Sequence, residues 1–166
     1  MDNNAKITQK NTELFIWCDG GSRNNPGPGA SAFVAKDNKG KLIYKEGKFL
    51  GKTTNNLAEY NAVLLALMWL KNNSEFPTPR EALSLSKDKV EGLIPNCEFY
   101  LDSRLVVSQL NGIFKIKDSG LREILFKIKM LENEIKIPIS YNLIPRERNW
   151  EADQLVNQIL DKNLLY

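Results

Sequence analysis

Residues 13–19, ELFIWCD, form an uninterrupted apolar run that ends on an acid and leads into glycines, asparagines and a proline. A run of this kind, bounded by turn-forming residues, is typical of a central strand that is buried on both faces of its sheet. A carboxylate at the end of such a strand is costly unless a positive group or a metal ion lies beside it. Asp19 is therefore the first candidate functional residue, and the rest of the chain has to supply its partner.

Four more strand-like segments are expected along the chain. Residues 29–37 and 41–51 are separated by the sequence NKG, a hairpin turn signal, and with the first strand they suggest an antiparallel meander. Residues 97–103 form a short apolar strand that again ends on an acid, and residues 135–145 form the last strand.

Four helical segments are expected between and after these strands. Residues 53–73 predict a long helix that is apolar almost all round and therefore buried. Residues 104–112 predict a short helix stopped by an Asn-Gly pair, residues 119–134 an amphipathic helix, and residues 149–163 a closing helix.

The length of 166 residues fits one domain with a sizeable core. Residues 1–12 are polar and are interpreted as a disordered leader, and residues 13–166 as the single domain. Residues 74–97 do not fit a short connection and are interpreted as an insertion that decorates an edge, with a partner-binding role as the alternative.

Composition excludes several classes of site. The chain has no histidine, which removes His-based acid–base catalysis, Ser-His-Asp triads and His-ligated zinc. Its two cysteines are far apart and lack a metal-ligand pattern, so both are expected to be reduced. No window predicts a membrane span and the polar start lacks a secretory signal, so a cytoplasmic protein is expected. The net charge of +3 is compatible with a nucleic-acid partner if the lysines cluster.

Two more acids occupy positions comparable to that of Asp19. Asp102 ends the fourth strand, and Glu59 lies in the first turn of the long helix. Each has a purely structural alternative: an Asx turn for Asp19, a helix cap for Asp102, and a capping box between Asn56 and Glu59. If the acids had only structural roles, all three of these explanations would have to be true at once. One shared site explains the three acids together and is therefore favoured.

A fourth acid follows from the periodicity of the last helix. Asp153 is expected at the edge of the buried arc of this helix, and Glu151 well outside it. Asp153 either interacts favourably with the helix macrodipole or reaches into a cleft beside the sheet. The expected buried arc comprises Ala152, Leu155, Val156, Ile159, Leu160 and Leu164.

Four carboxylates without a histidine or thiolate partner suit magnesium or manganese rather than zinc. Carboxylates clustered around two such ions form the kind of site that is used for in-line phosphoryl displacement. Metal binding is therefore the hypothesis that explains an acid at the end of the buried first strand.

Four blocks of the sequence then resemble, in order, the motifs of type 1 ribonuclease H. The blocks are DGGSRNNPGPGASAFV, TTNNLAEYNAVLLAL, LDSRLVVSQLNGIFKIK and IPRERNWEADQLVN, and each carries one of the four acids. The resemblance extends roughly from Leu14 to Asn163. It implies the α/β fold of that family, a mixed five-stranded sheet with three antiparallel and then two parallel strands and helices on both faces.

The resemblance implies that Asp19, Glu59, Asp102 and Asp153 are catalytic carboxylates that bind two Mg²⁺ ions, with Mn²⁺ possible in their place. The implied reaction is endonucleolytic hydrolysis of the RNA strand of an RNA–DNA hybrid, which leaves a 5′-phosphate and a 3′-hydroxyl. RNA would be distinguished from DNA by hydrogen bonds to the 2′-hydroxyl. The positions implied to contact substrate are Gly20, Gly21, Ser22, Asn25, Thr54, Asn55, Asn56, Ser103, Lys115, Lys117 and Arg146. Turn and cap formation is the alternative role for several of them, and the two roles can coexist.

Two departures from the family pattern place the chain in a subset. Many members have a histidine in the loop before the last acid, whereas this chain has Arg146 and Glu147 there, which either take over part of that role or are solvated loop charges. The basic, Trp-containing protrusion of some members is absent, and only Lys115 and Lys117 stand in its place. Binding is therefore expected to be weak and less sensitive to salt than in a heavily basic relative.

Two other readings remain open from the sequence. One is a related nuclease that prefers double-stranded RNA or RNA–DNA junctions, and the other is a non-catalytic module that binds hybrid or RNA. Loss of an acid would mark the non-catalytic module, and all four acids are present. A monomer is expected, because no exposed apolar stripe stands out.

Overall fold

The computed structural model describes residues 13–73, 96–135 and 137–164. The leader predicted at 1–12 lies outside the described residues, and so does the predicted insertion up to residue 95. Cys97, where the insertion was expected to end, is already the first residue of a strand.

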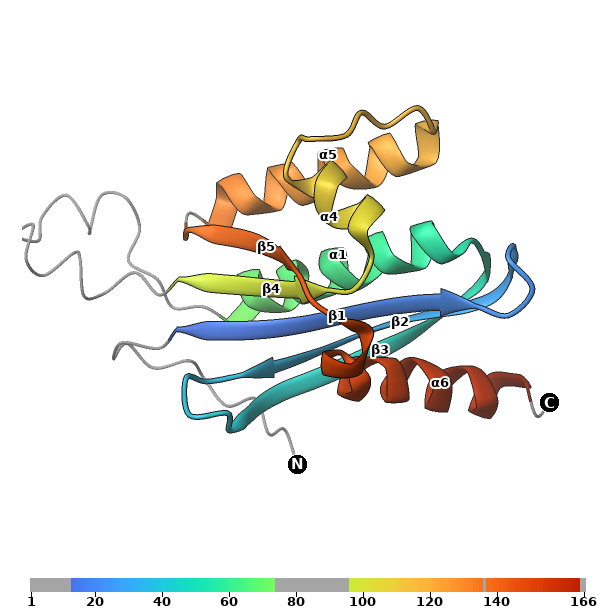
Figure 1. Ribbon diagram of the computed structural model, residues 1–166, viewed down its shortest axis with the longest axis horizontal. Helices are drawn as coiled ribbons and strands as arrows, with labels where there is room; N and C mark the ends of the chain where they lie inside the picture. The colour runs from blue at the N-terminus through green and yellow to red at the C-terminus, as the bar shows by residue number, and fades with distance from the viewer. Residues whose placement is uncertain (1–12, 74–95, 136, 165–166) are drawn as a thin grey trace, which may run out of the picture.

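Five strands form one sheet in the order β3-β2-β1-β4-β5. The first three pair antiparallel, while β4 pairs parallel with β1 and β5 pairs parallel with β4. This arrangement confirms the predicted mixed sheet of three antiparallel and two parallel strands (Figure 1). The strands are β1 (Leu14–Ser22), β2 (Gly27–Lys36), β3 (Leu42–Thr53), β4 (Cys97–Leu101) and β5 (Ile139–Leu143).

Helices cover both faces of the sheet, as predicted (Figure 1). Three helices lie on one face and share the large core cluster, namely α1 (Asn55–Asn73), α4 (Arg104–Leu110) and α5 (Ser119–Ile135). On the other face, α6 (Trp150–Leu164) packs on Ala30 and Ala32 of β2, directly after the short 3-10 helix η1 (Arg146–Arg148). None of the described helices has the length and apolar character needed to cross a membrane.

The turn signals in the sequence act where they were expected. Asp37 closes the β2–β3 hairpin, because its carboxylate accepts hydrogen bonds from the backbone N–H groups of Lys39 and Lys41, both at 2.9 Å. Gly40 in this turn and Gly112 after α4 have φ angles of 76° and 74°, a conformation that favours glycine. The hairpin and the end of α4 are therefore encoded locally.

The two faces of β1 are not covered equally, which corrects the expectation of a strand buried on both sides. Leu14, Ile16 and Cys18 face the large core and are buried. Phe15 and Trp17 point to the face that carries α6 and are only half-buried. The reason is that α6 packs over the part of this face that is lined by Ala30 and Ala32, further along the β1–β2 pair.

The buried arc of α6 is narrower than its periodicity predicts. Ala152, Val156 and Leu160 are buried, and Leu155 and Ile159 pack partly against the same cluster. Leu164 was wrongly included in the arc, since it is 48% exposed at the last turn of the helix.

Candidate active site

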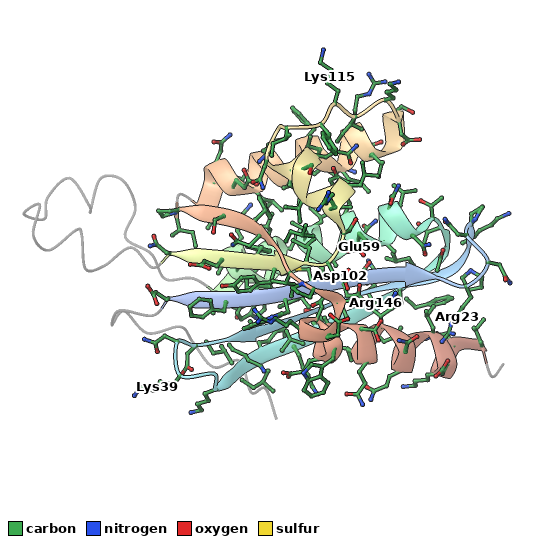
Figure 2. All side chains as sticks on the ribbon, in the orientation of Figure 1. Arg23, Lys39, Glu59, Asp102, Lys115 and Arg146 are labelled. Atoms are coloured by element: carbon green, nitrogen blue, oxygen red, sulfur yellow. The ribbon has the colours of Figure 1, made fainter. Side chains whose placement is uncertain are left out.

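Three of the four predicted carboxylates converge at one point of the fold. One oxygen each of Asp19, Glu59 and Asp102 lies within 4.8 Å of the others. The parallel register explains part of this convergence: Trp17 of β1 is aligned with Tyr100 of β4, so Asp19 and Asp102, two residues further on, come side by side. Figure 2 shows Glu59 and Asp102 close together beside Arg146.

Glu59 reaches the group because α1 lies directly on the first two strands. A Cβ atom on Gly20 would come 2.1 Å from the carbonyl carbon of Ala58 and 2.3 Å from the backbone nitrogen of Glu59. The Ser31 hydroxyl donates a 2.6 Å hydrogen bond to the carbonyl oxygen of Ala58 and fixes this close approach from β2. The absence of a side chain at Gly20 therefore brings the Glu59 carboxylate beside Asp19.

The structural alternatives for Asp19 and Glu59 are both wrong. Asp19 is not at a strand end or in a turn, because β1 continues to Ser22 and Asp19 is aligned with Ala32 of β2. Glu59 is not in the first turn of α1, which begins at Asn55. The cap is supplied by Thr54 instead, whose hydroxyl oxygen accepts from the backbone N–H of Leu57 at 3.3 Å.

Asp102 is not a helix cap either. The residue after it, Ser103, caps α4, since its hydroxyl oxygen accepts a 3.4 Å hydrogen bond from the backbone N–H of Val106. The Asp102 carboxylate is thus left to face Asp19 and Glu59.

Asp153 lies at the rim of the same site rather than within the group of three. It lines a cleft of about 360 Å³ together with Asp19, Glu59 and Asp102. Its carboxylate accepts hydrogen bonds from the Arg146 guanidinium at 3.2 Å and from the Asn157 amide at 3.1 Å. The structure therefore brings all four acids to one cleft and pairs Asp153, the outermost of them, with Arg146. Glu151, by contrast, forms an ion pair with Lys36, the last residue of β2.

The pKa values of the three clustered acids are raised, because the positive charge near them only partly compensates for burial and repulsion. Burial raises the pKa of Asp19 to about 7, with added repulsion from Asp102 and Asp153, against smaller lowering by the Gly20 N–H and Arg146. Burial also raises the pKa of Glu59 well above its usual value, with further contributions from Asp19 and Asp102. The pKa of Asp102 is raised by burial, although Arg146 and a hydrogen bond from Asn149 oppose the shift.

These residues fit a divalent cation. Within the described part of the chain, Glu59 Oε2 is buried and has no hydrogen-bond partner. Carboxylates that raise one another's pKa, together with a buried oxygen left unpaired, form a set of hard oxygen donors that a hard cation would stabilise. A zinc site would instead be expected to include thiolate or imidazole ligands.

We expect the metal-free protein to become less stable as the pH rises from about 4 to about 7. Because the pKa of Asp19 is raised from 3.8 to about 7, the folded chain retains in this window a proton that the unfolded chain has lost. Urea unfolding in the presence of a chelator should therefore give a higher midpoint at pH 5 than at pH 8. An Asp19→Asn variant should show a flatter dependence, and saturating Mg²⁺ should oppose the decline, since ligands bind metal deprotonated. A midpoint that rises over this range would contradict the assignment.

Five of the predicted substrate-contact residues line the cleft, namely Gly20, Gly21, Ser22, Asn55 and Arg146. Two of them are joined by hydrogen bonds, because Asn55 Oδ1 accepts from the backbone N–H of Ser22 at 2.8 Å and from its hydroxyl at 3.0 Å. The amide oxygen of Asn25 accepts in turn from the backbone N–H of Asn55 at 3.0 Å. These contacts fix the β1–β2 turn against the start of α1.

The remaining predicted contacts are not in the cleft lining. Thr54 and Ser103 serve as helix caps, and Asn56 follows Asn55 in the first turn of α1. Lys115 and Lys117 are exposed in the connection between α4 and α5. Figure 2 shows Lys115 at a distance from Glu59 and Asp102.

Sequence reasoning did not single out three polar residues that the structure places around the acids. Arg23 lines the cleft and donates to Asp161 at 2.9 Å and to Asn157 at 3.1 Å. Asn157 also donates to Asp153, and the fully buried Asn149 donates to the backbone of Cys18. The one sequence signal that could have identified them is their place inside the quoted motif blocks, which contain Arg23, Asn149 and Asn157.

Comparison with known proteins agrees with this geometry. The RNase H family model matches residues 11–138 of the chain. The bifunctional protein Rv2228c of Mycobacterium tuberculosis is 31% identical over 150 residues, which cover 90% of this chain and 36% of that protein. Ribonuclease HI of Halobacterium salinarum is 32% identical over 148 residues, which cover 89% of this chain and 64% of that protein. The chain thus spans between about a third and two thirds of the length of these relatives.

Solved structures of RNase H1 proteins also resemble this chain in fold. LC11-RNase H1, a protein isolated from compost by a metagenomic approach, has been solved in complex with an RNA/DNA hybrid. That structure matches with a TM-score of 0.76 and 34% sequence identity, over 92% of this chain and 99% of that chain.

Proposed function

The chain belongs to the RNase H family, and we propose that it is an endoribonuclease that hydrolyses the RNA strand of RNA–DNA hybrids. The observation that carries the proposal is the convergence of Asp19, Glu59 and Asp102 within 4.8 Å in a cleft that also contains Asp153. The similarity to a protein solved in complex with an RNA/DNA hybrid supports the choice of substrate.

Asp19, Glu59, Asp102 and Asp153 would hold the catalytic metal, for which we propose two Mg²⁺ ions, with Mn²⁺ as a substitute. When bound, such ions supply Lewis acidity and an activated water for in-line displacement at phosphorus, giving a 5′-phosphate and a 3′-hydroxyl. No side chain then has to form a covalent bond to the substrate, and no histidine is needed as a general base, which agrees with the absence of histidine from the chain.

The residues around the carboxylates would orient the hybrid. Ser22 and Asn55 lie at the cleft, and their hydrogen-bonded turn offers donors and acceptors of the kind that can recognise a 2′-hydroxyl. Arg146 already binds the Asp153 carboxylate, and its charge lowers the pKa values of Asp19 and Asp102. We propose that its exposed guanidinium also contacts a phosphate of the RNA strand, while Lys115 and Lys117 contact the hybrid outside the cleft.

A non-catalytic binding module is the weaker reading. Burying Asp19 and Glu59 beside Asp102 raises their pKa values and destabilises the metal-free fold, which a protein that only binds hybrid would have no reason to retain. A nuclease that prefers double-stranded RNA or junctions would use the same carboxylates, so substrate competition has to separate it from the proposal.

The proposal predicts metal-dependent cleavage of only the RNA strand of an end-labelled RNA–DNA hybrid. The assay compares Mg²⁺, Mn²⁺ and chelator, with double-stranded RNA, single-stranded RNA, duplex DNA and a junction substrate as controls. The products should carry 5′-phosphate ends, because the 3′ oxygen is the leaving group. If double-stranded RNA or the junction were cleaved faster than the hybrid, that nucleic acid would be the preferred substrate instead. A folded protein that cleaves none of these substrates would contradict catalysis.

A further inference from the structure

Asn149 lies between η1 and α6 and is completely buried, with an exposed fraction of 0%. It stands four residues before Asp153, in the segment that carries Arg146 into the cleft. A buried amide is costly unless its groups are paired, so the contacts of this side chain indicate what it does.

The Asn149 side chain connects two segments that carry carboxylates. Its amide nitrogen donates a 2.9 Å hydrogen bond to the carbonyl oxygen of Cys18, the residue directly before Asp19. It also donates toward the Asp102 carboxylate, and this lowers the pKa of Asp102 against the effect of burial. Both partners can only accept hydrogen bonds, so the orientation of the amide, with its nitrogen toward the sheet, follows from the chemistry.

The Asn149 backbone connects the same residue to the remaining parts of the site. Its carbonyl oxygen accepts from the backbone N–H of Asp153 at 3.1 Å, in the first turn of α6. Its N–H donates to the carbonyl oxygen of Arg146 at 2.9 Å. One residue is therefore bonded to the segments that hold Asp19, Asp102 and Asp153.

Helix capping does not account for this side chain. Asparagine before a helix normally accepts a hydrogen bond from the second or third N–H of that helix through its amide oxygen. Among the described residues, Asn149 Oδ1 has no hydrogen-bond partner at all. The side chain is turned away from α6 and toward the carboxylates, and its unpaired oxygen opposes stability rather than adding to it.

We infer that Asn149 is a positioning residue, which holds Asp19 and Asp102 at the spacing needed to bind a divalent cation. This inference rests on the proposed function, since it assigns a metal to these carboxylates. Asn149 acts on the cation through hydrogen bonds to the segments that carry the ligands, and such indirect partners typically change metal affinity or activity by roughly 10- to 100-fold when removed.

The test compares Asn149→Ala and Asn149→Ser with the wild-type chain. Serine is favoured before a helix but is too short to replace the amide, so Asn149→Ser keeps the inference testable if the alanine variant does not fold. Gln109→Ala is the matched control, because Gln109 is a buried amide that accepts from the Tyr60 hydroxyl at 3.0 Å and does not line the cleft.

Four quantities are measured for each protein: the Kd for Mn²⁺ by titration calorimetry, the urea midpoint, and kcat and KM on the hybrid. Both Asn149 variants should bind Mn²⁺ at least about 10-fold more weakly and show a comparable loss of kcat, with KM changed by less than about twofold. Gln109→Ala should lose stability and keep the wild-type Kd for Mn²⁺.

The inference is overturned if the Asn149 variants bind Mn²⁺ as the wild type does, or if Gln109→Ala loses as much affinity at equal loss of stability. If the wild type binds Mn²⁺ but leaves the hybrid intact, the proposed function fails, and the Mn²⁺ titrations still decide the role of Asn149. Absence of Mn²⁺ binding to the wild type would overturn both the proposed function and the role of Asn149.

Discussion

Replacing Asp102 with asparagine is expected to lower kcat for hybrid cleavage by on the order of 10³-fold, equivalent to about 4 kcal/mol of transition-state stabilisation. The amide keeps the shape of the side chain but removes the negative charge that faces Asp19 and Glu59 across less than 4.8 Å. Metal binding should weaken in parallel, because a neutral amide is a poorer ligand for a hard cation than a carboxylate. Cleavage rates and Mn²⁺ titrations measure both effects.

The same substitution should leave the metal-free fold intact or make it more stable. Asp102 raises the pKa values of Asp19 and Glu59, so removing its charge relieves repulsion. Glu98→Gln is the matched control, since Glu98 lies on the same face of β4 and accepts a 2.6 Å hydrogen bond from the Tyr100 hydroxyl outside the cleft. Near-native activity of Asp102→Asn, or an equal loss in Glu98→Gln, would remove Asp102 from the site.

Replacing Gly20 with alanine is expected to destabilise the fold by about 3 kcal/mol and to abolish cleavage, since severe overpacking costs at least the upper end of the usual range. The new methyl group would lie 2.1 Å from the carbonyl carbon of Ala58 and 2.3 Å from its oxygen. These are backbone atoms of α1, so the clash is relieved only if the whole helix moves away from β1. That movement would withdraw Glu59 from Asp19.

Gly21→Ala provides the comparison within the same strand. A Cβ on Gly21 would meet Val156 Cγ1 at 3.8 Å, which is an ordinary van der Waals contact. The stability change should therefore stay within about 1 kcal/mol, as for volume changes that the packing accepts. Urea unfolding of both variants tests the difference. Equal stability of the two variants would show that the approach of α1 to β1 does not depend on Gly20.

The secondary structure could be predicted largely from local patterns. Alternation and apolar runs located the strands, and turn chemistry located the Asp37–Gly40 hairpin and the end of α4 before Gly112. The parallel arrangement of β1 and β4 also explains why two acids at comparable positions along these strands meet. The alternation, the apolar runs and the turn signals depend on residues that are close in sequence, so a single chain is enough to reveal them.

Boundaries and alternative roles were less well determined. The sequence could not show that β1 continues to Ser22 and leaves Asp19 inside the strand, because glycines suit both turns and strands that a helix approaches closely. It could not separate Thr54 from Asn56 as the cap of α1, since both are good capping residues. In each case two local conformations have similar intrinsic preference, and tertiary packing selects between them.

The four acids and their order were therefore determined by the sequence alone, and their use as one site was decided by the tertiary structure. Glu59 joins Asp19 because Gly20 lets α1 approach β1, and Asn149 ties the start of α6 to Cys18 from 131 residues away. Interactions over such separations form only when the core has packed, because the entropy of closing the intervening chain must first be overcome. For the same reason the raised pKa values of the acids arise from the fold, since burial and mutual repulsion exist only once these side chains share a cleft.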